Sequence, residues 1–321
     1  VITAGEDRVE SYFALRVLSV KQVNGVSRLC LNEQPYFFHG LLDQGYFSDG
    51  IYLPASLRAY QEDILNAKAM GFNTLRKHIK IEPALFYALC DRLGMVVFQD
   101  MVNNGKYSFL RDTALPTLGA IKLSDRFIKR TIKQKDIFLH QMNKTMDHLH
   151  CFPSICYWTI FNEGWGQFEA DRVFQLAKQI DSSRFIDATS GWFWQKHSDV
   201  DSYHVYFKPV RLPVGSRPLV LSEFGGYSYN VPNHCFNSKK THGYKKLTSE
   251  QAYEAALVTL YEKEIIPSIP SGLCASIYTQ ISDVEDETNG LFTYDRQHTK
   301  VQYTSMMTLR EKIDSALRSS L

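Results

Sequence analysis

Residues 155–166 read ICYWTIFNEGWG, an apolar run that ends in the polar pair Asn162-Glu163 and then in glycine. A short apolar run bounded by turn residues is typical of a buried parallel strand, and glycine at its end lets a ligand approach the backbone closely. Residues 219–226, LVLSEFGG, have the same layout around Glu223. We therefore expect two buried strands that each carry a carboxylate at the carboxyl end.

Six other apolar runs alternate along the chain with longer segments of helical periodicity. This alternation is typical of parallel strands joined by crossover helices. The predicted strands are Tyr36–Leu42, Phe72–Ile79, Met95–Met101, Ile155–Asn162, Phe185–Ser190, Ser202–Tyr206, Leu219–Glu223 and Leu273–Thr279. Eight such strands predict an α/β fold, the (β/α)₈ TIM barrel, with its active site on the loops at the carboxyl ends of the strands.

Apolar stripes at helical spacing lie between most of these strands. The stripes are Leu57, Tyr60, Ile64 and Ala67; Leu85, Leu89 and Leu93; Phe138, Met142, Met146 and Leu149; Val173, Leu176, Ala177 and Ile180; and Tyr253, Ala256, Leu257 and Leu260. Gly71 and Gly94 should end the first two helices, and a capping box at Thr248 and Gln251 should begin the fifth. The last helix should begin near Val301. Strands five and six lack a following helical pattern, which predicts irregular crossovers.

The first 35 residues differ from the rest. Residues 11–22, SYFALRVLSVKQ, alternate like a strand, and a turn at Asn24-Gly25 leads to SRLCLNEQPYFF at 27–38. This pattern predicts a β-hairpin that caps the bottom of the barrel. We interpret residues 1–35 as an N-terminal β segment or linker, and 36–321 as one catalytic domain, because no repeat or Pro/Gly-rich linker divides them.

Composition restricts the class of function. The chain is 44% apolar and 22% charged, so it can bury a large core. Its 36 Lys and Arg nearly balance 34 Asp and Glu, without a basic stripe, so we expect neither a nucleic acid nor a membrane as partner. No apolar run approaches a membrane span, and the first residues lack the layout of a signal peptide, which favours a cytoplasmic location. The 18 Tyr, 20 Phe and 4 Trp are typical of proteins that stack on sugar rings.

The six cysteines do not indicate a metal or disulfide framework. Cys90, Cys156 and Cys274 lie in apolar runs, where a free thiol behaves as a small hydrophobe. The close pair Cys151 and Cys156 lacks the spacing and the His or Cys partners of a zinc site. We expect core thiols, with no structural metal and no cofactor.

A pair of carboxyl groups is what glycosidic bond hydrolysis requires: one protonates the leaving oxygen, and in retaining enzymes the other attacks the anomeric carbon from about 5–5.5 Å away. Strands four and seven face each other across the mouth of an eight-stranded barrel, so Glu163 and Glu223 can meet. A lone glutamate at a loop start is more often simply solvated. Two of them at matched strand ends, beside aromatic residues and glycine, favour a site.

These two motifs, Phe-Asn162-Glu163-Gly and Ser-Glu223-Phe-Gly, resemble the acid/base and nucleophile motifs of glycoside hydrolase family 2, which includes β-galactosidases and β-glucuronidases. The resemblance implies that Glu163 is the general acid/base and Glu223 the nucleophile. It also implies that Asn162 binds the sugar 2-hydroxyl, that Arg76 helps to keep the nucleophile ionised, and that Tyr206 hydrogen-bonds it. A strand-end cap and a half-buried strand tyrosine are the structural alternatives for Asn162 and Tyr206.

The resemblance extends over the whole barrel. His39-Gly40, residues 71–78 (GFNTLRKH) and residues 89–100 (LCDRLGMVVFQD) resemble the family's first three strands in order. Asp7–Val17 resembles the last strand of the immunoglobulin-like domain that precedes the barrel in these enzymes. The resemblance therefore implies upstream β-sandwich domains, and a homo-oligomer, as possible partners.

Other residues near strand ends are candidate sugar ligands: His39, His78, His204, Asp43, Asp100, Trp165, Trp192 and Tyr278. The structural alternatives are that the histidines are core residues and that the aspartates cap loops, which are the more common roles of isolated residues of these types. The acid/base needs a raised pKa, which Trp158, Phe161 and Trp165 could supply by desolvation.

Three departures from the family pattern bear on the substrate. The stretch 276–285 lacks the family's tryptophan after strand eight, Glu287-Thr-Asn289 replaces the Asn-x-Lys element that reads a uronic acid in β-glucuronidases, and the magnesium ligands of some β-galactosidases have no match. We therefore predict a retaining exo-glycosidase that cleaves a terminal neutral β-linked sugar, β-galactoside first. The alternatives are β-mannosidase, arabinosidase or β-glucuronidase specificity, or a carbohydrate-binding barrel without turnover.

Overall fold

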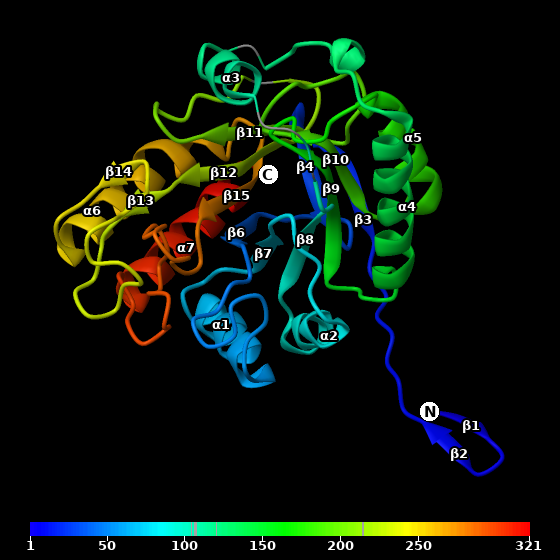
Figure 1. Cartoon of the computed structure of the whole chain (residues 1–321), viewed down its shortest axis with the longest axis horizontal. Coiled ribbons are helices and arrows are strands. Elements are labelled where there is room, and N and C mark those ends of the chain that lie inside the picture. Colours follow the sequence, from blue (N-terminus) through cyan, green and yellow to red (C-terminus); the bar gives the residue numbers. More distant parts are fainter. Residues whose placement is uncertain (104, 106–107, 120, 214) are drawn as a thin grey trace.

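Eight parallel strands form one sheet that curves into a barrel (Figure 1). The computed structural model describes residues 1–103, 105, 108–119, 121–213 and 215–321. The strands are β6 (Phe38–Asp43), β7 (Thr74–Lys77), β8 (Val96–Asp100), β9 (Ile155–Asn162), β10 (Phe185–Ser190), β11 (Asp201–Val205), β12 (Leu219–Gly225) and β15 (Leu273–Thr279). They follow the order β10-β9-β8-β7-β6-β15-β12-β11. The two end strands of this order, β10 and β11, also lie side by side, with the hydroxyl oxygens of Ser190 and Ser202 3.3 Å apart. The predicted TIM barrel is confirmed.

Helices surround this sheet (Figure 1). They are α1 (Leu57–Ala69), α2 (Ala84–Leu93), α3 (Leu115–Thr117), α4 (Ile132–Leu149), α5 (Ala170–Ile180), α6 (Glu250–Leu260) and α7 (Tyr303–Ser319), with short turns at Leu110–Ala114, Asp125–Phe127, Tyr261–Ile265 and Ile266–Ser268. In the described residues no helix follows β10 or β11 before the next strand, which confirms the predicted irregular crossovers. None of the described helices is long and apolar enough to cross a membrane.

Two details of the predicted helices are corrected. The side chain of Ser249, one residue beyond Thr248, caps α6 by accepting a hydrogen bond from the Ala252 backbone. In α2 the buried face is Phe86, Tyr87 and Cys90, whereas Leu85 is 54% exposed. The predicted face is therefore wrong. The sequence of α2 contains two apolar faces, and only packing against the sheet determines which of them is buried.

The hairpin β3 (Leu18–Val23) and β4 (Val26–Leu31) has the predicted turn, with Asn24 and Gly25 both at positive φ. The strand begins at Leu18 and not at residue 11, because residues 10–17 form no ladder and are attached instead through Arg16, whose guanidinium donates to the Pro153 and Ile155 carbonyls, 2.7 Å each. The remaining short strands are β1 (Ile2–Ala4), β2 (Asp7–Val9), β5 (Gln34–Pro35), β13 (Tyr227–Ser228) and β14 (Lys245–Lys246). Of these, β1 and β2 form a hairpin that projects from the barrel (Figure 1).

The β3–β4 hairpin closes the bottom of the barrel. Leu29 is fully buried in the inner apolar cluster with Phe38, Phe98 and Ile277. Arg28 is buried beside it and donates to the Ile269 carbonyl at 2.6 Å. The hairpin thus covers the apolar interior at the end of the barrel opposite the predicted site.

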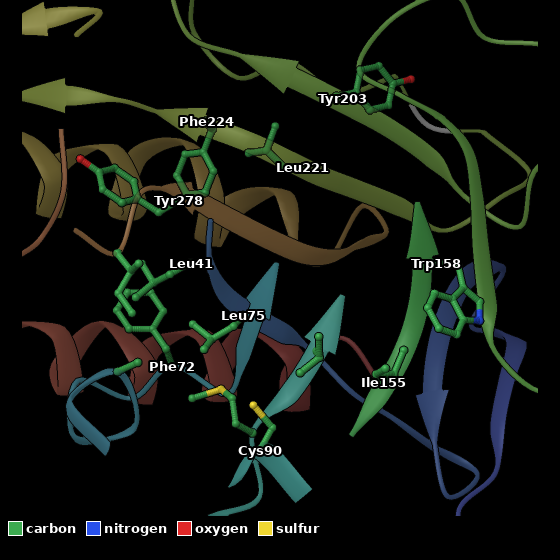
Figure 2. Close-up of a cluster of buried hydrophobic side chains, with 14 of the residues drawn as sticks. Leu41, Phe72, Leu75, Cys90, Ile155, Trp158, Tyr203, Leu221, Phe224 and Tyr278 are labelled. Carbon is green, nitrogen blue, oxygen red and sulfur yellow. The ribbon is translucent and has the colours of Figure 1, made fainter. Parts of the chain in front are cut away.

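A second, larger apolar cluster fills the layer between the sheet and the helices. Figure 2 shows Leu41, Leu75, Trp158 and Phe224 of this cluster on the outer face of the strands. Both faces of each strand are therefore buried, as is usual for a parallel sheet. The six cysteines are free. Cys30, Cys90, Cys156 and Cys274 are buried, as expected of core thiols, whereas Cys151 is exposed and Cys235 is half-buried, so that interpretation is wrong for these two.

Candidate active site

Glu163 and Glu223 lie together at the carboxyl end of the barrel. Nδ1 of His204 is 2.8 Å from Glu163 Oε1 and 3.5 Å from Glu223 Oε2. One oxygen of each carboxylate and this nitrogen all lie within 4.8 Å of one another. That spacing is well below the about 6.5–9.5 Å of inverting glycosidases and favours the closer pair of a retaining enzyme, which leaves no room for a water between the two groups.

The backbone holds Glu163 in an uncommon conformation. Its φ is +51°, in the left-handed region that residues other than glycine rarely adopt, and its N–H donates to the Ser190 carbonyl at 2.9 Å. Such strain costs on the order of 1–3 kcal/mol and concentrates at functional sites. Gly164 follows at φ +72°, so the chain turns sharply and leaves the Glu163 side chain partly exposed.

Arg76 on β7 connects the site residues. Its Nη1 donates to Glu223 Oε1 at 3.0 Å and its Nη2 to Asn162 Oδ1 at 2.8 Å, while Nε and Nη2 bind both oxygens of Asp100. Burial alone would raise the pKa of Asp100, but the Arg76 charge and the His78 hydrogen bond lower the pKa to about 2. Asp100 therefore stays ionised and holds Arg76, and both of its oxygens are occupied.

Tyr206, directly after β11, donates from its hydroxyl to Glu223 Oε2 at 2.5 Å. Burial and the neighbouring Glu223 raise the pKa of Tyr206 well above its ordinary value, so the phenol keeps its proton. Arg76 and Tyr206 thus donate to different oxygens of Glu223, which fixes the orientation of this carboxylate.

His204 is buried and neutral. Burial lowers its pKa to about 4. Its Nε2 lies 3.0 Å from Ser190 Oγ and 3.5 Å from Arg76 Nη1. Because Arg76 can only donate, Nε2 is assigned as the acceptor and Nδ1 carries the proton toward Glu163.

The hollow beside these groups has a volume of about 330 Å³. It is lined by Gln44, Tyr46, Tyr52, His78, Ile79, Lys80, Asn162, Glu163 and Trp165. His78 Nδ1 is 3.2 Å from Asp100 Oδ2; burial lowers its pKa, but the Asp100 and Glu223 contacts outweigh burial and raise it. Trp165 is 39% exposed at the rim. Trp192 packs edge-on against His204, with ring centres 5.5 Å apart.

Three predicted ligands face away from this hollow, toward the helices. His39 is bonded to Tyr261 Oη at 3.2 Å, Asp43 to Lys77 Nζ at 2.9 Å and Tyr278 to Tyr253 Oη at 2.9 Å. Side chains alternate between the two faces of a strand, so these three lie on the outer face while Arg76 and His204 lie on the inner one.

The aromatic surroundings expected for Glu163 are also corrected. Trp158 donates from Nε1 to Asp181 at 2.9 Å, and Phe161 stacks on Phe138 of α4, with ring centres 4.8 Å apart. Both rings belong to the outer layer, so of the three expected aromatics only Trp165 lines the hollow.

Tyr244 is a site residue that the sequence pattern does not mark. Its ring stacks on Tyr206, with centres 3.9 Å apart and planes 15° from parallel. Burial raises its pKa, and the charges of Glu223, Glu163 and Glu287 raise it further. Tyr244 lies in a loop without periodicity, so the sequence contains no signal for it.

Among the described residues, the side chains that could together hold a metal ion are also Glu163, His204 and Glu223. Two carboxylates and one imidazole are a donor set that divalent transition metals accept. In a glycosidase the same carboxylates must reach the sugar, so a bound ion and a substrate would compete for them.

A family model described as "Glycosyl hydrolases family 2, TIM barrel domain" matches residues 22–314. A β-galactosidase of Aeromonas hydrophila is 25% identical in an alignment of length 229 that covers 63% of this chain and 20% of that protein. A β-galactosidase of Priestia megaterium is 24% identical over 187 residues, 56% of this chain and 17% of the relative.

Solved structures share the fold at lower identity. A β-D-glucuronidase of Dictyoglomus thermophilum has a TM-score of 0.69 at 16% identity, and a β-galacturonidase of Eisenbergiella tayi has 0.65 at 16%. The alignments cover 94% of this chain and 54% and 55% of those chains, so this chain spans about half their length and about a fifth of the two β-galactosidases. On the match of the family model to almost the whole chain, this protein belongs to glycoside hydrolase family 2, through its TIM barrel domain.

Proposed function

We propose that the protein is a retaining exo-glycoside hydrolase that cleaves a terminal neutral β-linked sugar, with a β-galactoside as the first candidate. The observation that carries this proposal is the pair of carboxylates on either side of His204, with one oxygen of each within 4.8 Å of the other. A binding barrel has no need of two such groups at this distance. The hollow of about 330 Å³ is at the small end of ligand pockets, which favours one terminal sugar.

In the first proposed step, ionised Glu223 attacks the anomeric carbon while Glu163 gives a proton to the glycosidic oxygen, and the aglycone leaves as an alcohol. The bond formed is an ester between the sugar and Glu223. In the second step Glu163 takes a proton from water, the hydroxide attacks the same carbon, and Glu223 leaves as a carboxylate. The two inversions retain the β configuration.

Other residues support these steps by position. Arg76 and Tyr206 hold Glu223 oriented until it attacks. Asn162, whose carbonyl oxygen accepts from Arg76, can offer its amide to the sugar 2-hydroxyl. The proton on His204 Nδ1 stabilises Glu163 when that carboxylate is ionised, which is its state after the first step.

The choice of β-galactoside is supported by the two sequence relatives, which are both β-galactosidases. The names of the similar solved structures favour a second candidate, a β-glucuronide or β-galacturonide. β-Mannoside and α-arabinoside specificities are the further alternatives. Upstream β-sandwich domains, and a homo-oligomer, are the partners that we propose from membership of the family.

The test is hydrolysis of a panel of 4-nitrophenyl glycosides: β-galactoside, β-glucuronide, β-mannoside, β-glucoside and α-arabinoside. Glu223→Gln should abolish turnover of every substrate that the wild type hydrolyses, whereas Glu311→Gln, on the exposed face of α7, should change nothing. Glu163→Gln should retain most of its kcat/KM on a 2,4-dinitrophenyl glycoside, because that leaving group needs no proton, whereas its kcat should fall because the second step loses its general base.

For each β-glycoside, the configuration of the first product, followed by proton NMR, should be β. An α product from any of them would contradict the retaining mechanism. Absence of turnover on the whole panel, with sugar binding intact, would instead support the carbohydrate-binding alternative.

A further inference from the structure

Glu287, in the loop after β15, is held by two amide side chains. Its Oε2 accepts from Gln44 Nε2 at 2.8 Å and from Gln280 Nε2 at 3.1 Å. Gln44 Nε2 also donates to Gln280 Oε1 at 3.0 Å, which closes a triangle of three side chains. An ionised carboxylate can only accept, so both amide groups must turn their NH₂ toward Glu287. The triangle therefore fixes the position of a negative charge.

This charge is held by Gln44, one of the residues that line the catalytic hollow. Gln44 lines the hollow together with Glu163, and the Tyr244 phenol senses the charges of Glu223, Glu163 and Glu287 together. Glu287 is half-buried, and its Oε1 accepts no hydrogen bond from the described residues. One oxygen is thus anchored while the other is open to a ligand.

The cations around the hollow are already paired. Arg76 binds Asp100 and Glu223, His78 binds Asp100, and Lys80 lies 2.9 Å from Glu82 Oε1. Lys80 also donates to the carbonyls of Gly45 and Tyr52. A carboxylate on a bound sugar would therefore meet the charge of Glu287 and, among the described residues at the hollow, no unpaired cation to offset it.

We infer that Glu287 is a specificity-determining residue, whose open oxygen accepts a hydrogen bond from a sugar hydroxyl and whose charge excludes uronic acids. The inference rests on the proposed function, since it assigns the sugar class that the same pocket takes. Burying two like charges at short range without a cation is unfavourable, whereas a charge-assisted bond to a hydroxyl is favourable. Glu287 would thereby give this protein a different sugar specificity from the structurally similar β-glucuronidases and β-galacturonidases.

The test compares 4-nitrophenyl β-galactoside with 4-nitrophenyl β-galacturonide, which differ only in CH₂OH against carboxylate at C6. The quantity measured is the ratio of their kcat/KM values in the wild type, in Glu287→Gln and in Glu285→Gln. Glu285 is an exposed carboxylate two residues away, so its variant controls for loss of loop charge alone. We expect the wild type to favour the galactoside, Glu287→Gln to lower the ratio at least tenfold, and Glu285→Gln to leave it within twofold.

An unchanged ratio in Glu287→Gln, or a wild type that favours the galacturonide, overturns the inference but leaves the glycosidase proposal intact. If no protein turns over any glycoside, the proposed function fails, and calorimetric titration with free galactose and galacturonate decides the inference. Tighter binding of galacturonate to Glu287→Gln than to the wild type, by at least tenfold, then supports it. Equal affinities, or no binding of either sugar to either protein, overturn it.

Discussion

Nδ1 of His204 lies 2.8 Å from Oε1 of Glu163, so a neutral imidazole on β11 hydrogen-bonds the carboxylate that follows β9. The other ring nitrogen faces Arg76, which in turn holds Glu223. The two carboxylates of the site therefore belong to one buried hydrogen-bond network. A substitution of any residue in this network should therefore affect both Glu163 and Glu223.

Replacing His204 should flatten the pH dependence of stability. The unfolded histidine titrates near 6.5, whereas burial lowers the folded pKa to about 4. Between these values the unfolded state binds more protons, so stability falls as pH drops from 6.5 toward 4. His204→Gln should remove up to about 3 kcal/mol of this fall. Urea unfolding of both proteins from pH 4 to 7.5 measures it, and parallel curves would contradict the prediction.

Arg76→Lys should reduce both activity and stability. A lysine cannot bind Asp100 in bidentate fashion and also reach Glu223 and Asn162. We expect a fall in kcat/KM of about 100-fold or more, and a loss of about 3 kcal/mol in the free energy of unfolding. Arg217→Lys is the control, because the Arg217–Asp201 pair is more exposed and should cost under about 1 kcal/mol. Equal effects of the two substitutions would refute the assigned role of Arg76.

The strands could be predicted from the sequence to within two or three residues, because short apolar runs between turn residues leave few alternatives. The face of the sheet on which each side chain lies could not be predicted. His39, Asp43 and Tyr278 were expected at the pocket, yet the structure places them toward the helices. Both faces of these strands are buried, so the sequence shows no polar and apolar alternation that would define the inner face.

Tyr206→Phe should impair the nucleophile without unfolding the protein. The substitution removes the hydroxyl that donates to Glu223 Oε2, and loss of one such donor at a reacting carboxylate costs about 100-fold in kcat/KM. Tyr253→Phe is the matched control, because that hydroxyl is bonded to Tyr278 outside the hollow. The control should keep activity within about twofold and lose about 1 kcal/mol of stability.

Gly225→Ala should destabilise the end of β12. Gly225 has φ +84°, and a Cβ there would lie 2.3 Å from the Tyr278 ring. We expect a loss of about 2–4 kcal/mol, measured by thermal unfolding. Gly25→Ala separates the two causes, because Gly25 has a similar φ of +78° but nothing within 4 Å of the added atom. The control should cost about 1 kcal/mol, and an equal loss would show that the contact with Tyr278 is unimportant.

The proximity of the loop residues of the site could not be predicted, for a different reason. The two glutamates stand at strand ends, where the fold determines their position. Gln44, Tyr244 and Glu287 come from three loops that are distant in sequence and meet only when the barrel closes. Their proximity arises only in the tertiary structure, so it produces no periodic pattern in the sequence.

The barrel closes by pairing its first strand with its last, with Phe38 of β6 opposite Ala275 of β15. On the ribosome, β6 emerges long before β15, so one edge of the nascent sheet stays unpaired through most of synthesis. Arg76 and Asp100 can pair early, while Glu223 joins them only when β12 emerges. An open apolar edge invites pairing with another chain. Substitutions that weaken β15 should therefore lower the yield of soluble protein more than the specific activity of the molecules that fold.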